Sequence, residues 1–125
     1  MQILIVDKSR AQRNATSHFL QDLGLKVQET ADGTEALRYL KTAEPPAGVL
    51  VDWDLPGMNG LEFIQKIRQD PKHSGLPIIL MADDKFNDRV AEALTIGADE
   101  VLMKPFTKEV LATKLELLGI ESSED

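Results

Sequence analysis

Short apolar runs alternate with segments of helical periodicity five times along this chain. The clearest run, Val49–Val51, lies in the segment VLVDWDLPGMNG, and three consecutive apolar residues are typical of a strand buried on both faces. Four further runs with strand character cover Gln2–Val6, Lys26–Thr30, Ile78–Met81 or Ala82, and Glu100–Met103. Because strands that alternate with helices indicate βαβ units, the pattern predicts an α/β fold with a parallel sheet, right-handed crossovers and helices on both faces.

Cap residues and periodicity place the helices between these strands. Ser9 and Thr107 are suited to cap the first and last helices, and Asn59 or Gly60 to open the third. In the first helix, four-residue spacing predicts a face made of Ala11, Ala15, Phe19 and Leu23. The later helices are expected to bury Leu61, Ile64 and Ile67 in the third, and Val90 and Leu94 in the fourth, near Asn87–Ile96.

Composition narrows the class of protein. The chain has 125 residues, 42% hydrophobic and 28% charged, which suits one domain with a single core. It has no cysteine, so disulfides and thiolate metal sites are excluded, and no apolar run approaches the roughly 20 residues of a membrane span. The net charge of −7 argues against a nucleic-acid surface. Since no secretory leader precedes the first strand, we expect a cytoplasmic protein that contacts neither nucleic acid nor membrane.

The four clearest strands end in two acids, an alanine and a lysine: Asp7, Asp52, Ala82 and Lys104. The carboxyl ends of parallel strands meet at one edge, where open α/β sheets bind ligands. Two carboxylates there repel each other unless a cation intervenes, and Mg²⁺ suits carboxylate and carbonyl oxygens. Lys104 adds a positive charge suited to a phosphoryl oxygen, so Asp52 is the candidate nucleophile toward phosphorus.

Each of these residues alone has a structural explanation, since an aspartate after a strand is more often a turn former or a helix cap. A lysine before a proline is nearly always a solvated side chain. The joint pattern of acid, acid and lysine at the ends of the first, third and fifth strands is what favours chemistry.

The chain resembles the receiver domain of two-component response regulators. The matching segments are ILIVDK, VLVDWDLPGMNGLEF, GLPIILMA and GADEVLMKPF, and together they span essentially the whole chain. The resemblance implies a doubly wound, flavodoxin-like sheet of five parallel strands in the order 2-1-3-4-5 over residues 1–120, followed by an acidic tail at 121–125. It implies a signalling phosphoacceptor in a phosphorelay, not a metabolic enzyme, which catalyses only its own phosphorylation and dephosphorylation.

The resemblance also implies roles for individual residues. Asp52 would be the phosphoacceptor, taking a phosphoryl group from a histidine kinase or a phosphotransfer protein. Asp7, Asp52 and the backbone carbonyl of Asp54 would bind Mg²⁺, and Lys104 and the backbone of Ala82 would bind the phosphate. The bond before Pro105 would be a candidate for the cis form. A downstream effector protein would bind the face formed by the fourth helix, the fifth strand and the fifth helix.

Three positions depart from the family pattern. Lys8 stands where a second acid usually ligates the metal, and Ala82 stands where the fourth strand usually ends in Ser or Thr. Val101 stands where an aromatic switch residue is usual. A missing hydrogen bond to a charged group costs about 1.5–3 kcal/mol, and without the hydroxyl–aromatic pair the usual relay to the outer face is lost. We count Lys8, Val101 and the loop acids Asp83 and Asp84 as residues that modulate the site.

Lys8 carries a specific hypothesis. Losing a carboxylate ligand and gaining an ammonium should weaken Mg²⁺ binding. We hypothesise that this ammonium pairs with Asp52 or Asp7 and partly replaces the metal.

Other functions stay open at this point. A pseudo-receiver, which is an interaction module that signals without phosphate, is favoured by the three departures and opposed by the intact Asp7, Asp52 and Lys104. The pair Asp52 and Asp54 also resembles the acids of haloacid-dehalogenase-type phosphatases, but that family has the motif on its first strand. A flavodoxin-like FMN site needs a glycine-rich phosphate loop that is missing after Asp7. The chain is expected to be either a free-standing receiver or a piece of a larger protein.

Overall fold

The computed structural model describes residues 1–42, 44–83 and 88–121. The elements in chain order are β1 (Gln2–Val6), α1 (Arg10–Asp22), β2 (Lys26–Thr30), α2 (Gly33–Thr42), β3 (Gly48–Asp52), α3 (Gly60–Gln69), the 3-10 turn η1 (Pro71–His73), β4 (Ile78–Ala82), α4 (Val90–Ile96), β5 (Glu100–Met103) and α5 (Lys108–Leu117). None of the helices in these ranges is both long enough and apolar enough to cross a bilayer.

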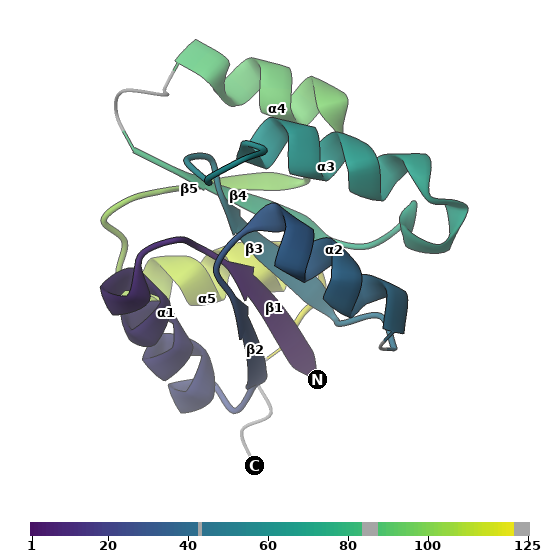
Figure 1. The fold of residues 1–125 in the computed structure, drawn as a ribbon. Coiled ribbons are helices and arrows are strands. Elements are labelled where there is room, and N and C mark those ends of the chain that lie inside the picture. Colours follow the sequence, from purple (N-terminus) through teal and green to yellow (C-terminus); the bar gives the residue numbers. More distant parts are fainter. Residues whose placement is uncertain (43, 84–87, 122–125) are drawn as a thin grey trace.

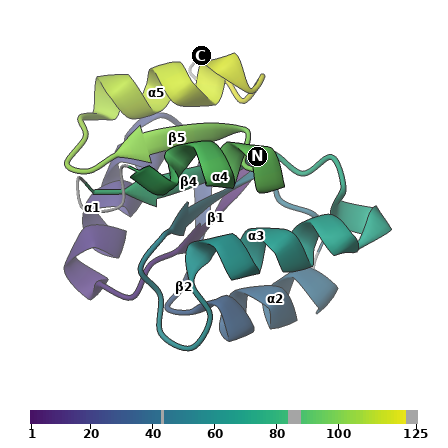
Figure 2. The ribbon, with the colours of Figure 1, turned by 90° about the horizontal axis from the view of Figure 1, so that it is seen from above.

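The strands form one parallel sheet in the order β2-β1-β3-β4-β5, which confirms the predicted topology. Helices α1 and α5 cover one face of the sheet, and α2, α3 and α4 cover the other (Figures 1 and 2). The direction of winding reverses between β1 and β3. In doubly wound sheets this switch point opens a crevice at the carboxyl ends of the strands, and that is where β1 leads into Asp7 and β3 ends at Asp52.

Alternation along the central strands divides the core between the two faces. On the α2–α3–α4 face, strand residues such as Leu4 and Val51 pack with Phe63 and Ile64 of α3. On the α1–α5 face, Ile5 packs in a second apolar cluster; its members from the two helices are Leu20, Leu111 and Leu115. All five residues of β3 and all five of β4 are buried, as expected for strands covered on both faces.

One predicted helix face is half right and another is wrong. On the predicted face of α1, Phe19 and Leu23 pack against the second apolar cluster as expected. In α1 the residues that face the sheet are Thr16, Ser17 and Leu20, whereas Ala11 and Ala15 are exposed. Ser17 can be buried on this face because its hydroxyl donates a hydrogen bond of 2.9 Å to Glu29 of β2.

In α4 the buried residue is Ala93, while Leu94 is 46% exposed and Val90 only partly buried. The helix is short, and its small residue faces the sheet. The helix itself starts at Val90, and the predicted start at Asn87 falls outside the described residues.

The turn from β3 into α3 brings the chain sharply back past Asp52. Asn59, one of the two residues predicted to open this helix, caps α3 through a reciprocal capping box with Glu62. A Cβ on Gly60 would lie 2.7 Å from the carbonyl oxygen of Asp52, so only glycine fits where the helix crosses the end of the strand. The strand end is thereby held against the first turn of α3.

Candidate functional site

The side chains of Asp7, Asp52 and Lys104 meet at the carboxyl edge of the sheet. Lys104 Nζ donates to Asp7 Oδ2 at 2.9 Å and to Asp52 Oδ2 at 3.1 Å. Asp7 and Asp52 lie 97 and 52 positions from Lys104 along the chain. The parallel arrangement of β1, β3 and β5 brings the three residues together. We call these three residues the acceptor cluster. The convergence that the sequence predicted is confirmed.

Asp7 is the most deeply held member of the acceptor cluster. Its side chain is 1% exposed. Its Oδ1 accepts from the backbone N–H of Ser9 at 2.9 Å, and its backbone carbonyl accepts from Arg13 Nη1 at 2.6 Å. Because Ser9 also caps α1 by accepting from the N–H of Gln12, the acid is tied to the start of that helix.

Asp52 is less completely buried, and it reaches solvent. Its side chain is 11% exposed, and its Oδ1 accepts only a long bond of 3.4 Å from the N–H of Asp54. Burial raises the pKa of Asp52 above its ordinary value of 3.8, and the neighbouring Asp7 adds to the rise, while the Lys104 ammonium opposes it. A carboxylate that is paired with a cation, partly desolvated and still accessible is suited to act as a nucleophile.

Lys104 is positioned by the backbone at the end of β5. Its N–H donates to the carbonyl of Ala82 at 2.7 Å, which continues the ladder between β4 and β5, and the Lys104–Pro105 bond is cis, as predicted. Its side chain is 15% exposed and also donates to Gln12 Oε1 on α1. Gln12 was not among the predicted site residues, since an exposed glutamine on a helix has no distinctive signal.

Lys8 does not make the contact that was hypothesised. Its Nζ lies 2.7 Å from Asp54 Oδ2, and both side chains are about half exposed, at 50% and 46%. The hydrogen bond to Asp54 is the main reason why the pKa of Lys8 is raised, with smaller contributions from Asp52 and Asp7 at longer range. The pairing with Asp52 or Asp7 is therefore wrong, because Lys104 already occupies the position between those two carboxylates.

The β4–β5 side of the same edge is apolar. Ala82 is 1% exposed and Val101 is partly buried, and both belong to the apolar cluster on the α2–α3–α4 face. Trp53 packs in this cluster at 7% exposure, with the Arg89 guanidinium 6.0 Å from its ring centroid. Positions 82 and 101 therefore carry neither a hydroxyl nor an aromatic group that could connect the acceptor cluster with the outer face of β5.

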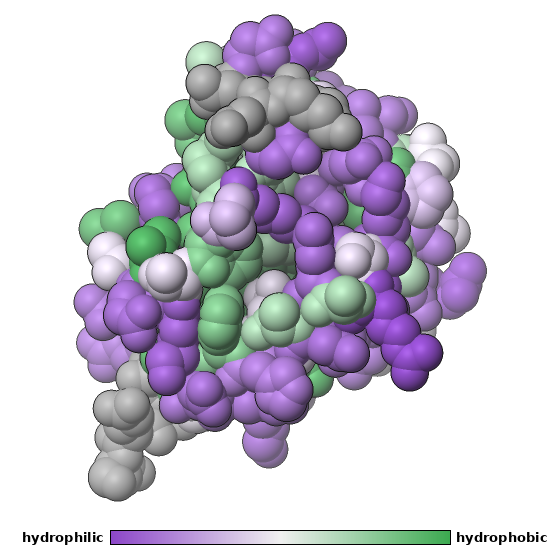
Figure 3. All heavy atoms as spheres, turned by 90° about the vertical axis from the view of Figure 1, so that its left-hand side faces the viewer, coloured by the Kyte–Doolittle hydropathy of each residue, from purple (hydrophilic) through white to green (hydrophobic). Residues whose placement is uncertain are grey.

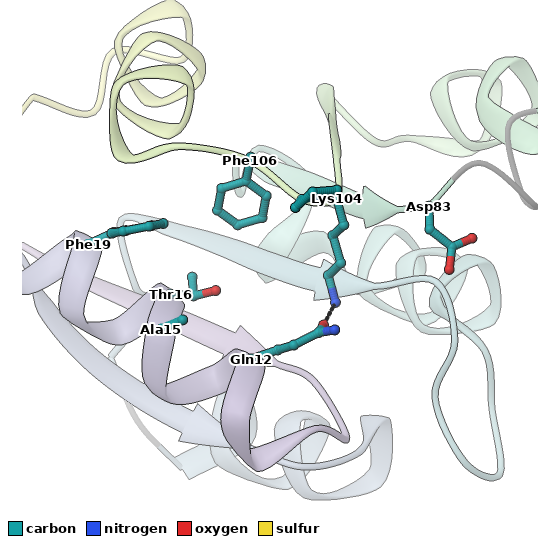
Figure 4. Close-up of a pocket in the computed structure, with 8 residues that line it drawn as sticks. Gln12, Ala15, Thr16, Phe19, Asp83, Lys104 and Phe106 are labelled. Carbon is teal, nitrogen blue, oxygen red and sulfur yellow. Dashed lines mark hydrogen bonds between the residues drawn. The ribbon is translucent and has the colours of Figure 1, made fainter.

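A cavity of about 360 Å³ opens beside Lys104, between α1 and the segment that follows β5. Figure 4 shows Phe19 and Phe106 at one end of it and Lys104, bonded to Gln12, at the other. Asp83 also lines the cavity, whereas Asp84 lies outside the described residues. On this side of the molecule, hydrophobic residues gather around a central hollow and hydrophilic residues surround it (Figure 3).

The described part of the chain contains no group of three or more His, Cys, Asp or Glu side chains arranged to hold a metal ion. The acceptor cluster offers two carboxylates, and the missing third side-chain oxygen is the one that Lys8 replaces in sequence. The carbonyl of Asp54 follows two residues after Asp52 and stays a predicted ligand.

Comparisons with known proteins agree with this geometry. The family model described as the response regulator receiver domain matches residues 3–116. A chemotaxis protein CheY homologue of Campylobacter jejuni is 37% identical over 126 residues, which cover 99% of this chain and 97% of that protein. CheY1 of Helicobacter pylori is 34% identical over 119 residues, covering 94% and 96% of the two chains.

Solved structures give the same answer for the fold. The chemotaxis response regulator CheY4 of Vibrio cholerae matches with a TM-score of 0.86 and 32% identity, covering 94% of this chain and 97% of that one. The signal receiver domain of a histidine kinase from Syntrophus aciditrophicus matches with a TM-score of 0.86 and 28% identity, covering 99% and 95%.

Proposed function

Because this chain belongs to the response regulator receiver domain family, we propose that it accepts a phosphoryl group on Asp52 and signals through altered protein binding. The observation that supports this proposal best is the acceptor cluster. An accessible carboxylate, a second buried carboxylate and an ammonium meet at the switch point of the sheet, 2.9 and 3.1 Å from the lysine nitrogen.

The chemistry follows from these charges. One carboxylate oxygen of Asp52 attacks the phosphorus of a phosphohistidine, the new P–O bond forms, and the P–N bond breaks with its electron pair leaving on the imidazole nitrogen. Lys104 exchanges its bond to Asp52 for one to a phosphoryl oxygen and neutralises part of the charge that moves with the group. Asp7 keeps its hydrogen bond to Lys104 and holds the ammonium in place.

The oxygen donors fit a weakly held Mg²⁺. Asp7, Asp52 and the Asp54 carbonyl are the residues that would hold it, and hard oxygen ligands are what this cation prefers. When bound, it would supply additional neutralisation of the phosphoryl oxygens. Lys8 works against this site, because it brings a positive charge onto Asp54 at the mouth of the cluster.

The donor we propose is a histidine kinase or a histidine phosphotransfer protein. The cavity beside Lys104 adjoins the acceptor cluster through that lysine, so a donor protein that delivers a phosphohistidine to Asp52 would also meet Phe19 of α1 and Phe106. Autophosphorylation from a small phosphodonor and slow hydrolysis of the adduct would need only the acceptor cluster.

The output surface we propose is the face formed by α4, β5 and α5. Three large apolar side chains are exposed on its helices: Leu94 at 46%, Val110 at 45% and Leu117 at 64%. Exposed apolar side chains of this kind suit a protein partner. Because Ala82 and Val101 provide no hydroxyl–aromatic relay, movement of Lys104 and the β4–β5 ends would have to carry the signal.

A pseudo-receiver that signals without phosphate is the second candidate, and the observations that favour it are Lys8, Ala82 and Val101. Incubation with acetyl phosphate and Mg²⁺ followed by intact mass measurement separates the two. The phosphoacceptor function predicts a hydroxylamine-labile adduct of one phosphoryl group that is absent in Asp52→Ala. An unmodified wild-type chain under conditions that label a CheY protein would favour the pseudo-receiver.

A further inference from the structure

The ammonium of Lys104 uses all of its hydrogen-bonding capacity within the protein. A lysine side chain has three N–H donors and no acceptor. Its three acceptors here are Asp7 Oδ2 at 2.9 Å, Asp52 Oδ2 at 3.1 Å and the side-chain oxygen of Gln12. Figure 4 shows the Gln12 side chain reaching from α1 toward the end of the lysine. The third acceptor is neutral, and it is the only one of the three that comes from a helix.

The position of Gln12 is set by the same residues that hold Asp7. Its backbone N–H donates to Ser9 Oγ at 3.2 Å, and the N–H of Ser9 donates to Asp7 Oδ1 at 2.9 Å. The first turn of α1 is therefore fixed to the acceptor cluster. From this turn, the Gln12 side chain reaches the ammonium of Lys104.

We propose that Gln12 is a positioning residue for Lys104, which makes α1 part of the phosphoryl-transfer site. With Asp7 and Gln12 each accepting one N–H, the third N–H is directed at Asp52 and is the one available to a phosphoryl oxygen. Because Gln12 is neutral, it fixes the ammonium without competing in charge with the incoming phosphoryl group. The inference rests on the proposed function for its catalytic consequence, but the contact itself is testable without phosphorylation.

The decisive variant is Gln12→Met, which keeps the length and helix propensity of the side chain and removes its oxygen. Gln12→Glu keeps an acceptor oxygen at the same distance. Gln21→Met, an exposed glutamine near the other end of α1, is the matched control for the chemical change alone. Two measurements on these proteins test the proposal.

The first measurement uses no phosphodonor. The Lys104 ammonium is observed by ¹⁵N NMR at low temperature, assigned by its loss in Lys104→Met, and its hydrogen exchange with water is timed. We expect exchange about five-fold faster in Gln12→Met than in wild type, and unchanged exchange in Gln12→Glu and Gln21→Met. Equal exchange rates in all four proteins would overturn the proposal.

The second measurement is the rate of labelling by acetyl phosphate. We expect the maximal rate in Gln12→Met to fall about five-fold with little change in the half-saturating concentration. Gln12→Glu should recover part of this loss, because its oxygen holds the ammonium while its charge repels the phosphoryl group and keeps the rate below that of the wild type. A loss that Gln12→Glu does not recover, or an equal loss in Gln21→Met, would overturn the positioning role. A wild-type chain that is never labelled would overturn the proposed function, while the ammonium exchange still decides the contact.

Discussion

The two halves of the sheet edge differ in what they offer a phosphoryl group. On the β1–β3 half, Asp7 and Asp52 are bridged by Lys104, which reaches across from the end of β5, and Asp7 is also tied to α1. On the β4–β5 half, Ala82 and Val101 are packed into the apolar core and present no polar side-chain atom. The charged groups that would accept the phosphoryl group are all present. The two positions that would sense it, Ala82 and Val101, carry apolar side chains that pack in the core.

If the proposed function holds, acceptance and transmission of a phosphoryl group would depend on separate residues of one edge. Acceptance requires three charges within hydrogen-bonding distance, and the fold supplies them whatever stands at Ala82. Transmission would require a group that moves with the phosphate. Neither Ala82 nor Val101 has a polar side-chain atom that could follow it, so this movement would fall to Lys104. Four experiments test this contrast, and we take them in order of decreasing expected effect.

Removing the lysine should have the largest effect. In Lys104→Met, the two carboxylates lose their shared cation and the phosphoryl oxygens lose their fixed donor. We expect labelling by acetyl phosphate to fall by at least about 100-fold, and the free energy of unfolding at neutral pH to fall by about 3 kcal/mol. Intact mass and urea denaturation measure the two quantities.

The control for this change is Lys108→Met, which removes a half-exposed lysine of α5 that lies 3.6 Å from Asp22. It should change labelling and stability little. Equal labelling in Lys104→Met and in wild type would show that the acceptor cluster does not stabilise the transferring group.

Restoring a hydroxyl to the β4–β5 half should raise acceptance. In Ala82→Thr, a donor to the phosphoryl oxygen is worth about 1.5–3 kcal/mol, and crowding of the buried position costs about 1 kcal/mol. We expect labelling to become about ten-fold faster. The pair Ala82→Thr with Val101→Tyr should produce larger phosphorylation-dependent NMR shifts on α4, β5 and α5 than the wild type does.

Ala98→Thr is the matched control, since Ala98 is 6% exposed in the same apolar cluster but lies away from the edge. If it accelerates labelling as much as Ala82→Thr does, the hydroxyl has no special position. Phosphorylation-dependent shifts in the wild type as large as in the double variant would contradict the separation of the two halves.

Reversing the charge at Lys8 should strengthen metal binding. Lys8→Asp removes the ammonium from Asp54 and adds an oxygen ligand beside Asp7. We expect the affinity for Mg²⁺, followed through Trp53 fluorescence, to rise by about ten-fold. Lys26→Asp makes the same charge change at an exposed position on β2 and should leave the affinity nearly unchanged. Near-micromolar binding in the wild type, unaltered by Lys8→Asp, would refute the role given to Lys8.

The smallest effect concerns pH and stability. Because the pKa of Asp52 is raised above 3.8 in the folded protein, the folded state holds this proton more tightly than the unfolded state does. The contribution of Asp52 to stability is therefore fully present below pH 3.8 and is lost as the pH rises through the higher folded value. Asp52→Asn should consequently be more stable than wild type at neutral pH, with an advantage that shrinks on acidification.

Denaturation of both proteins across this pH range measures the difference, with Asp22→Asn as a control at an exposed acid of α1. A constant difference between wild type and Asp52→Asn at all pH values would show that folding leaves the proton affinity of Asp52 unaltered.

Much of the fold could be predicted because strong local signals agreed with each other. The runs at β3 and β4 are apolar on both faces, and Asn59 and Thr107 cap helices where expected. The helix faces of α1 and α4 could not be predicted by spacing alone. Thr16 and Ser17 are buried because Glu29 and the sheet satisfy or cover them, and such tertiary partners leave no mark on a four-residue period.

The acceptor cluster could be predicted because strand ends in a parallel sheet share one edge. The hydrogen-bond partners of Lys8 and Gln12, which lie beside the cluster, could not be predicted. Lys8 reaches Asp54 and not the buried acids, because the place between those acids is taken by a lysine from β5. The contact of Gln12 with Lys104 could not be predicted, because it depends on where α1 begins relative to the sheet. Neither the residue type nor the exposure of Gln12 indicates this position.

The most direct test of the central claim locates the phosphoryl group on the chain. Wild-type protein labelled with acetyl phosphate is reduced with borohydride, which converts an aspartyl phosphate to homoserine, and its peptides are sequenced by mass spectrometry. The acceptor cluster predicts homoserine at position 52 and nowhere else, with none formed in Lys104→Met under the same conditions. Homoserine at position 7 or 54, or equal conversion without the lysine, would contradict it.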